Sequence, residues 1–442
     1  MSGRAIRYRT RAGAAVGAVA VLLCGLTMLL GYANKARCLG PEFTDEGRSV
    51  PAYDVRLSRD ACYSDIQHLW VLRELGEHHL PYLSGGITPG GEMYGGNVEY
   101  PVLTGMLIWV GALGAATDAG FLLASALLMA PFGLLTAALL ARLSRWRALL
   151  WSLGPPLVLY AFHNWDLPVV ACAVGAVWVM CGWRTDRTVA ERGVVAAVLL
   201  GLGFGFKLYP AAFVLPLAAY VLTSRDDGWD VRGAVRVCLA AAVTAVLVNL
   251  PFVVLGYQGW RGSIEFQQLR EADITTNSIW YWGFRPISDS DAFQAIVDVV
   301  SPLLVLASFA LALALGWRRY RDEGSYPWVA VSAAMLCGFL LLHRVHSPQY
   351  TLWLLPFFVL LHVRWGWIAA YLVADAAMGI GIFRWFYVAG NDLPDGINDG
   401  LAAQAVVVGV WGRAALLVAL FVVFSRSRTT IVDDRAPVAT VR

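Results

Sequence analysis

A succession of long apolar runs is the feature that most limits how this 442-residue chain can fold. Each run is long enough, or nearly so, to cross a hydrocarbon core about 30 Å thick. A soluble domain would not need so many of them, and 58% hydrophobic against 15% charged residues also favours a membrane protein. We therefore predict an all-α integral membrane protein with about twelve transmembrane helices, at about residues 12–33, 118–141, 147–162, 164–183, 193–206, 208–224, 233–256, 293–317, 326–342, 348–363, 366–383 and 401–424.

Basic residues predict the orientation of these helices. Four arginines precede the first run and no A-x-A cleavage site follows it, which indicates a retained signal anchor with its N-terminus in the cytoplasm. Alternation from that start places the Arg-rich connections, such as 183–192, and the C-terminus on the cytoplasmic side. This orientation requires that the apolar stretch 100–116 does not cross. Because it is short and begins at Pro101, we expect it to be an interfacial helix on the outer side of the plasma membrane.

The chain shows no sequence repeat that would divide it. We expect a single transmembrane domain over residues 1–424, with extracytoplasmic loops at 34–117 and 257–292 and a disordered cytoplasmic tail at 425–442. The net charge of +3 is too small to indicate nucleic acid as a partner, so the lipid bilayer is the partner that composition predicts.

Two cysteines differ from the other five. Cys38 and Cys62 both lie in the first outer loop, which faces an oxidising compartment, so a disulfide and two free thiols both remain open. The other five lie in or beside predicted spans, where cysteine acts as a small apolar residue. No CxxC, HExxH or clustered His/Cys spacing indicates a metal site.

The first outer loop carries a candidate general base. Ser64 and Gln67 fit a capping box that opens a helix with Asp65 at its first position. A helix dipole favours an anionic carboxylate there, the form that a base needs, although acids are also common in first turns for that reason alone. The same helix is amphipathic, and its apolar face is predicted to meet the membrane through Ile66, Leu69, Trp70 and Leu75.

Other polar residues gather on the predicted outer side. A very short turn carries His163, Asn164 and Asp166, which are more polar side chains than a turn needs. Glu99 and Tyr100 lie near the end of the first loop. Glu99 has a plain alternative as a helix cap. Carboxylates, amides and aromatic faces of this kind suit carbohydrate, and we add Arg270 of the second loop to these candidate sugar and acceptor contacts.

A cationic group is predicted beside them. Lys207, one of only two lysines in the chain, follows a glycine-rich span, and His343, Arg344 and His346 follow another. Snorkelling at helix ends is the ordinary alternative. Together the four residues would offer a pocket for a phosphate at the bilayer surface. Asp375 is the one acid deep in a span, and a buried structural partner is its simplest role.

Several motifs together resemble a known family. A basic N-terminus with one span is followed by "CYSDI", by "YP" at Tyr100–Pro101 and by "KLYPAAFVLPL" after a glycine-rich span. This order is similar to that of glycosyltransferase family 87 of the GT-C superfamily, over residues 12–360. Many members read "YPP" where this chain has Val102, and the turn at 163–166 also departs from the family pattern. These departures leave the sugar and the acceptor open.

The resemblance implies a specific chemistry. It predicts inverting, metal-independent and cofactor-free transfer of mannose, or alternatively arabinofuranose, from a polyprenyl-phosphate donor to a glycolipid or glycan of an actinobacterial envelope. Asp65 would be the base, and Lys207, Arg344, His343 and His346 would stabilise the leaving phosphate. A secondary transporter or flippase is the alternative, although it would predict inverted repeats that the sequence does not show. A non-catalytic scaffold is the third hypothesis.

Overall fold

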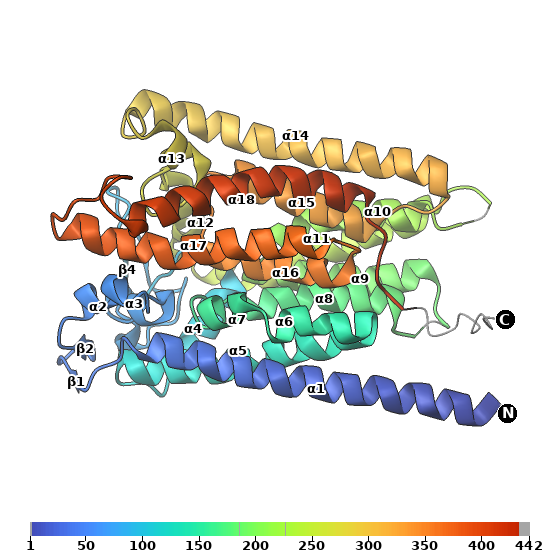
Figure 1. Cartoon of the computed structure of the whole chain (residues 1–442), viewed down its shortest axis with the longest axis horizontal. Helices are drawn as coiled ribbons and strands as arrows, with labels where there is room; N and C mark the ends of the chain where they lie inside the picture. The colour runs from blue at the N-terminus through green and yellow to red at the C-terminus, as the bar shows by residue number, and fades with distance from the viewer. Residues whose placement is uncertain (1, 185, 226, 433–442) are drawn as a thin grey trace.

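The computed structural model describes residues 2–184, 186–225 and 227–432 of the chain, and Figure 1 shows a bundle of roughly aligned helices. Within these residues, seven helices are long and apolar enough to cross a membrane. They are α1 (Ser2–Ala36), α5 (Asp118–Ser144), α9 (Val189–Phe206), α11 (Val231–Leu255), α14 (Asp291–Glu323), α17 (Trp365–Gly390) and α18 (Leu401–Arg426).

Shorter helices fill the bundle between the long ones. The apolar ones of 10 to 17 residues are α4 (Val102–Ala112), α8 (Leu167–Cys181), η3 with α10 (Tyr209–Phe213 and Val214–Leu222) and α15 (Trp328–Leu342). The shortest are η2 (Arg145–Ala148), α6 (Leu149–Ser152), α7 (Pro155–Tyr160), η4 (Pro348–Tyr350) and α16 (Thr351–Leu360). The prediction of a helical multi-pass membrane protein is confirmed, whereas the number of crossing helices stays a prediction.

Two predicted spans are not continuous helices. The run at 147–162 is divided among η2, α6 and α7, because Gly154 and the two prolines after it interrupt the helical hydrogen bonds. The run at 348–363 becomes η4 and the ten-residue α16, in which every residue is buried. A helix buried on all sides is apolar all round for reasons of packing, so its composition alone does not show that it spans a membrane.

The polar connections gather at one end of the bundle, on the left of Figure 1. The first loop forms the hairpins β1–β2 and β3–β4 and the helices α2, α3 and η1, and the second forms α12 and α13; all lie at this end. Their bounds are β1 Glu42–Phe43, β2 Ser49–Val50, β3 Gly86–Ile87, β4 Met93–Tyr94, α2 Tyr53–Arg59, α3 Asp65–Leu72, η1 Leu75–Glu77, α12 Tyr257–Leu269 and α13 Ile279–Phe284. The two hairpins are antiparallel and are the exceptions to an all-α fold.

The two predicted outer loops pack against each other. Asn97 donates a hydrogen bond to the carbonyl of Gly259, at 2.9 Å, and Gln267 donates one to the carbonyl of Glu99, at 2.7 Å. The face of α3 that was predicted to meet the membrane is instead buried against the core beside α5, at Ile66, Leu69, Trp70 and Leu75. The loops therefore form one cap over the helix ends.

The start of α1 and the end of α18 both point toward the opposite end, on the right of Figure 1. The chain beyond α18 was predicted to be disordered from residue 425, but residues up to 432 pack on the bundle: Thr429 pairs with Leu361, and the Val432 amide donates to the Leu143 carbonyl. Unpaired backbone groups at the end of α16 account for this docking, because they need hydrogen-bond partners. Residues 433–442 lie outside the described part.

Candidate active site

Lys207 is placed by the glycine-rich end of α9. That helix ends at Phe206, whose carbonyl accepts a hydrogen bond from the Thr104 hydroxyl of α4 at 2.7 Å. A Cβ at Gly205 would lie 2.9 Å from a methyl carbon of Leu103, so glycine allows α4 and α9 to approach closely. The approach brings the Lys207 ammonium over the ring of Tyr100, 4.5 Å from its centroid.

Asp65 is placed by two hydrogen bonds that tie the start of α3 to the turn before α8. The Asp65 amide donates to the His163 carbonyl at 2.8 Å, and the Ser64 hydroxyl donates to the Phe162 carbonyl at 2.7 Å. Ser64 is the N-cap residue, as predicted, but the capping box is absent because its hydroxyl is used in this tie and the Gln67 side chain has no partner among the described residues. The Asp65 side chain stays partly accessible to solvent.

One amide joins the carboxylate to the ammonium. Asn164 Nδ2 donates to Asp65 Oδ2 at 2.5 Å and to the Tyr100 hydroxyl at 2.9 Å, while Asn164 Oδ1 accepts from Lys207 Nζ at 2.9 Å. The second Asp65 oxygen accepts from the Tyr63 hydroxyl at 2.7 Å. A side-chain amide donates through its nitrogen and accepts through its oxygen, so Asn164 suits both charged neighbours at once.

Asp166 lies next to Lys207, the last member of this hydrogen-bonded series. Its Oδ1 accepts from Trp353 Nε1 at 2.8 Å and lies 3.9 Å from Lys207 Nζ. The ring of Trp353 stacks between Tyr209, at 4.5 Å, and Tyr350, at 3.8 Å. Four buried polar atoms around this stack have no hydrogen-bond partner among the described residues: Asp166 Oδ2, Tyr209 Oη, His346 Nε2 and Gln349 Oε1. Buried polar atoms are costly unless they are paired, so a polar ligand at the stack would be stabilised by them.

Lys35 is the functional candidate that the sequence reasoning missed. From the end of α1, its ammonium donates to the Tyr63 carbonyl at 2.7 Å and contacts His163 Nδ1 at 3.2 Å. Burial, with added repulsion from the charges of Lys35 and Lys207, lowers the pKa of His163 well below its ordinary value. His163 is therefore a neutral acceptor for Lys35. The rarity of lysine in the chain was the available signal, and it was followed only to Lys207.

The predicted cationic group at 343–346 is different in the structure. Arg344 forms an ion pair with Asp298 and donates to the carbonyls of Gln267 and Gln268, so it holds α12 to α14. Burial lowers the pKa of His343 to about 4, and burial together with the charge of Arg413 lowers that of His346 well below its ordinary value. Both histidines are thus neutral near pH 7 and supply no positive charge to a phosphate.

Arg270 and Glu99 also differ in their surroundings. Glu99 is bonded to Arg73 at 2.9 Å, whereas the Arg270 guanidinium makes no hydrogen bond or ion pair within the described part of the chain. The pKa of His343 is lowered first by burial and then also by the charge of Arg270, so the two groups are close enough to interact. Arg270 is therefore an uncommitted cation near the Trp353 stack.

The remaining predicted residues are structural in their contacts. Cys38 and Cys62 form a disulfide that joins the end of α1 to the segment before α3. Asp375 accepts from the Thr351 hydroxyl at 2.5 Å and lies 3.7 Å from the buried Arg413 of α18. Within residues 2–184, 186–225 and 227–432, no group of three or more His, Cys, Asp or Glu side chains is placed to hold a metal ion.

Comparison with known families gives the site its context. The model of Glycosyltransferase family 87 matches residues 98–348. This chain belongs to glycosyltransferase family 87. With its candidate spans it is a multi-pass membrane glycosyltransferase. The matched range contains Tyr100, Asn164 and Lys207, while Asp65 precedes it.

Among solved structures, the family 87 chain is similar to ArnT from Cupriavidus metallidurans, crystallised bound to undecaprenyl phosphate. The two share 16% sequence identity, and the match covers 92% of this chain and 77% of ArnT with a TM-score of 0.41.

Proposed function

We propose that this protein transfers a sugar from a polyprenyl-phosphate donor to a glycolipid or glycan of the cell envelope, on the outer side of the plasma membrane. Mannose is the first candidate sugar and arabinofuranose the second. The observation that carries the proposal is the chain from carboxylate to amide to ammonium, Asp65–Asn164–Lys207. It sets a base and a cation on either side of one amide, at the polar end of an apolar bundle.

The proposed reaction is a single displacement with inversion at the anomeric carbon. Asp65 takes the proton of an acceptor hydroxyl, whose oxygen forms the new bond to that carbon. The bond from the anomeric carbon to the phosphate oxygen breaks, and polyprenyl phosphate leaves with the electron pair. Tyr63 and Asn164 orient the carboxylate, which keeps lone pairs free to accept the proton. A positioned base of this kind contributes on the order of 10²–10⁴ in rate.

We assign the leaving phosphate to Lys207 and Arg270 rather than to Arg344 and the two histidines. Lys207 is close to the Asp65–Asn164 pair, and Arg270 is uncommitted near His343 and Tyr350. Charge-assisted hydrogen bonds from these cations would strengthen as negative charge develops on the departing phosphate. The sugar hydroxyls would meet the unpaired atoms of Asp166, Tyr209, His346 and Gln349 around Trp353.

A narrow apolar crevice borders the polar site. It is lined by residues of α8, η3, α15 and α16, and Tyr209 and Trp353, which border the polar site, belong to its wall. The crevice reaches along α8 and α16 to Val177 and Leu360. The crevice has a volume of only about 10 Å³, so a prenyl chain would enter it only after its walls move apart.

The test of the base uses purified protein in lipid with a panel of polyprenyl-phosphate sugars and an envelope lipoglycan acceptor. Asp65→Asn should lower kcat by about 10²–10⁴. Asp54→Asn is the matched control, since Asp54 is an exposed acid of the same loop, on α2. Transfer that survives in Asp65→Asn would contradict the role of the base, and no transfer by wild type with any donor would favour the transporter or the scaffold.

The phosphate assignment has a separate measurement. Lys207→Met and Arg270→Gln should each raise the donor KM by about tenfold or more, the equivalent of one charge-assisted hydrogen bond. Arg261→Gln is the control, because it removes an exposed charge from α12, the helix that ends just before Arg270. Transfer should also continue in EDTA, because the proposed displacement uses no metal. An unchanged donor KM in both pocket variants would remove the cations from the donor site.

A further inference from the structure

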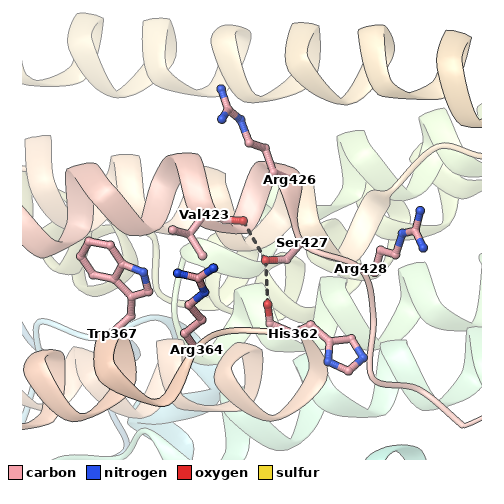
Figure 2. A pocket seen from close by; sticks show the side chains of 7 residues that line it. All are labelled: His362, Arg364, Trp367, Val423, Arg426, Ser427 and Arg428. Atoms are coloured by element: carbon pink, nitrogen blue, oxygen red, sulfur yellow. Dashed lines mark hydrogen bonds between the residues drawn. The ribbon is translucent and has the colours of Figure 1, made fainter.

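The end of the bundle opposite the polar site carries a second pocket. It has a volume of about 590 Å³, at the start of α17 and the end of α18. Figure 2 shows its lining residues, which are His362, Arg364, Trp367, Val423, Arg426, Ser427 and Arg428. Arg364 and Arg428 lie on either side of Ser427 in this view, and Trp367 lies beside Arg364.

The pocket walls are fixed by hydrogen bonds. Ser427 Oγ donates to the carbonyls of Val423, at 2.7 Å, and His362, at 3.2 Å. The His362 amide donates to the Arg428 carbonyl at 2.9 Å, and the following residues pair with the end of α16. The segment that carries Arg428 is thus held between α17 and α18 and forms one wall of an open pocket.

Three arginines of the pocket are uncommitted. The side chains of Arg364, Arg426 and Arg428 are exposed, and their guanidinium groups make no hydrogen bond or ion pair within the residues that the structure describes. Nearby arginines differ. Arg319 is bonded to Glu323 at 2.8 Å and to the Ser427 carbonyl at 2.7 Å, and Arg147 donates to carbonyls at the end of α16. Glu323 is within reach of the charge of Arg428 but is already hydrogen-bonded to Arg319, so the three pocket arginines keep a net positive charge.

The surroundings indicate the kind of anion. α17 and α18 are both apolar candidate spans, so the pocket at their ends lies where hydrocarbon meets water. Guanidinium groups bind phosphate oxygens in pairs, and the Trp367 ring and Val423 add an apolar side typical of the interfacial region. We propose that this pocket binds a phosphate group, and that its source is the headgroup of an anionic membrane phospholipid.

The alternative is that these arginines only contribute to the charge bias between the two membrane sides. Such a bias does not require a pocket, and any arginine at this end of the bundle would contribute to it equally. Arg318 and Arg321 of α14 are exposed at the same end and do not line the pocket. They supply a control of equal charge.

The experiment compares three full-length proteins in nanodiscs that contain phosphatidylcholine with or without phosphatidylglycerol. Native mass spectrometry after release measures the retained phosphatidylglycerol. Wild type and Arg318→Gln/Arg321→Gln should retain it equally, and Arg364→Gln/Arg428→Gln should retain at least fivefold less. Equal loss in both double variants would overturn the site in favour of general charge.

A second arm separates the two sources of phosphate. Inorganic phosphate is titrated against each protein in discs of phosphatidylcholine alone, and binding is followed through Trp367 fluorescence, with Trp367→Phe as the blank. Little or no saturable binding at millimolar phosphate is expected. Saturable binding that is lost in Arg364→Gln/Arg428→Gln, without selective retention of phosphatidylglycerol, would overturn the lipid assignment.

Discussion

Both lysines of the chain reach the same short turn. Lys207 bonds the Asn164 side chain, and Lys35 bonds the Tyr63 carbonyl and contacts His163. The two ammonium groups therefore contact neighbouring residues of this turn, His163 and Asn164, and both of these residues are hydrogen-bonded to Asp65. Lys35 does not touch the carboxylate, so we infer that it is a positioning residue that acts through Tyr63.

Replacing Lys35 tests this inference. Lys35→Met should lower kcat by about tenfold, because a loosened Tyr63 orients the base less well and misplaced groups lose rate steeply. The donor KM should stay within about twofold. Arg37→Met is the control, since among the described residues its guanidinium is hydrogen-bonded only to Asn34. A Lys35→Met protein with a raised donor KM and normal kcat would place Lys35 in the donor site instead.

The buried histidines predict how stability depends on pH. His343 has a pKa of about 4 in the folded protein, lowered first by burial and then by the charges of Arg344 and Arg270, against about 6.5 when unfolded. Below pH 6.5 the unfolded chain binds a proton that the folded chain does not, so stability is complete above 6.5 and falls as pH decreases toward 4. The free energy of unfolding should drop by about 2 kcal/mol between pH 7 and pH 5 from His343 alone.

Thermal unfolding in detergent at pH 7 and pH 5 measures this effect. His343→Gln removes the titrating ring, so its unfolding midpoint should change less with pH than that of wild type. His79→Gln, a change at an exposed histidine, should keep the wild-type dependence. Identical pH dependence in His343→Gln and wild type would show that His343 does not titrate between the two states.

Single residues could be predicted from sequence where the chemistry was local. Asp65 and Asn164 were proposed because a helix start and a short turn place polar groups in a known direction, and the structure joins the two side chains by a hydrogen bond. The ion pair of Arg344 was not predicted, because its partner, Asp298, comes from another helix and no spacing rule connects them. Arg413 was overlooked for the same reason: its acid, Asp375, is across the α17–α18 contact.

At the scale of elements, the contact between α17 and α18 depends on small residues. A Cβ at Gly409 would lie 2.6 Å from Met378 Cβ and 2.7 Å from Met378 Cα, and one at Gly381 would lie 2.7 Å from Ala405 Cβ. Such close backbone approach is common between membrane helices. It also brings Arg413 within reach of Asp375, so packing and the buried charge pair depend on each other.

Gly409→Ala should therefore separate the two helices. The added methyl group would meet the backbone of Met378, which cannot rotate away, and overpacking of this kind costs about 1–3 kcal/mol. Gly366→Ala in the first turn of α17 is the control, because a Cβ there meets nothing within 4 Å. Detergent unfolding should show a lower midpoint for Gly409→Ala and an unchanged or higher one for Gly366→Ala. Equal midpoints would mean that α17 and α18 can move apart without loss of stability.

For the whole molecule, the sequence predicts the separation of polar groups better than it predicts the helices. Arginine-rich connections and chemically varied loops alternate along the chain, and Figure 1 places the outer loops together at one end. Helix lengths were harder to predict, because a buried helix such as α16 and a lipid-facing one such as α11 are both apolar. Which end faces the cytoplasm stays a prediction from the arginines.

The two ends of α14 can settle that orientation. This helix has 33 residues, and at 1.5 Å per residue it is about 50 Å long, so both ends should extend beyond a hydrocarbon core of about 30 Å. Asp291 and Asp322 are exposed at opposite ends. In intact cells a membrane-impermeant maleimide should label Asp291→Cys, and should label Asp322→Cys only after permeabilisation. Unaltered protein gives the background from the free cysteines. The reverse pattern would put Asp65 on the cytoplasmic side and contradict an envelope acceptor.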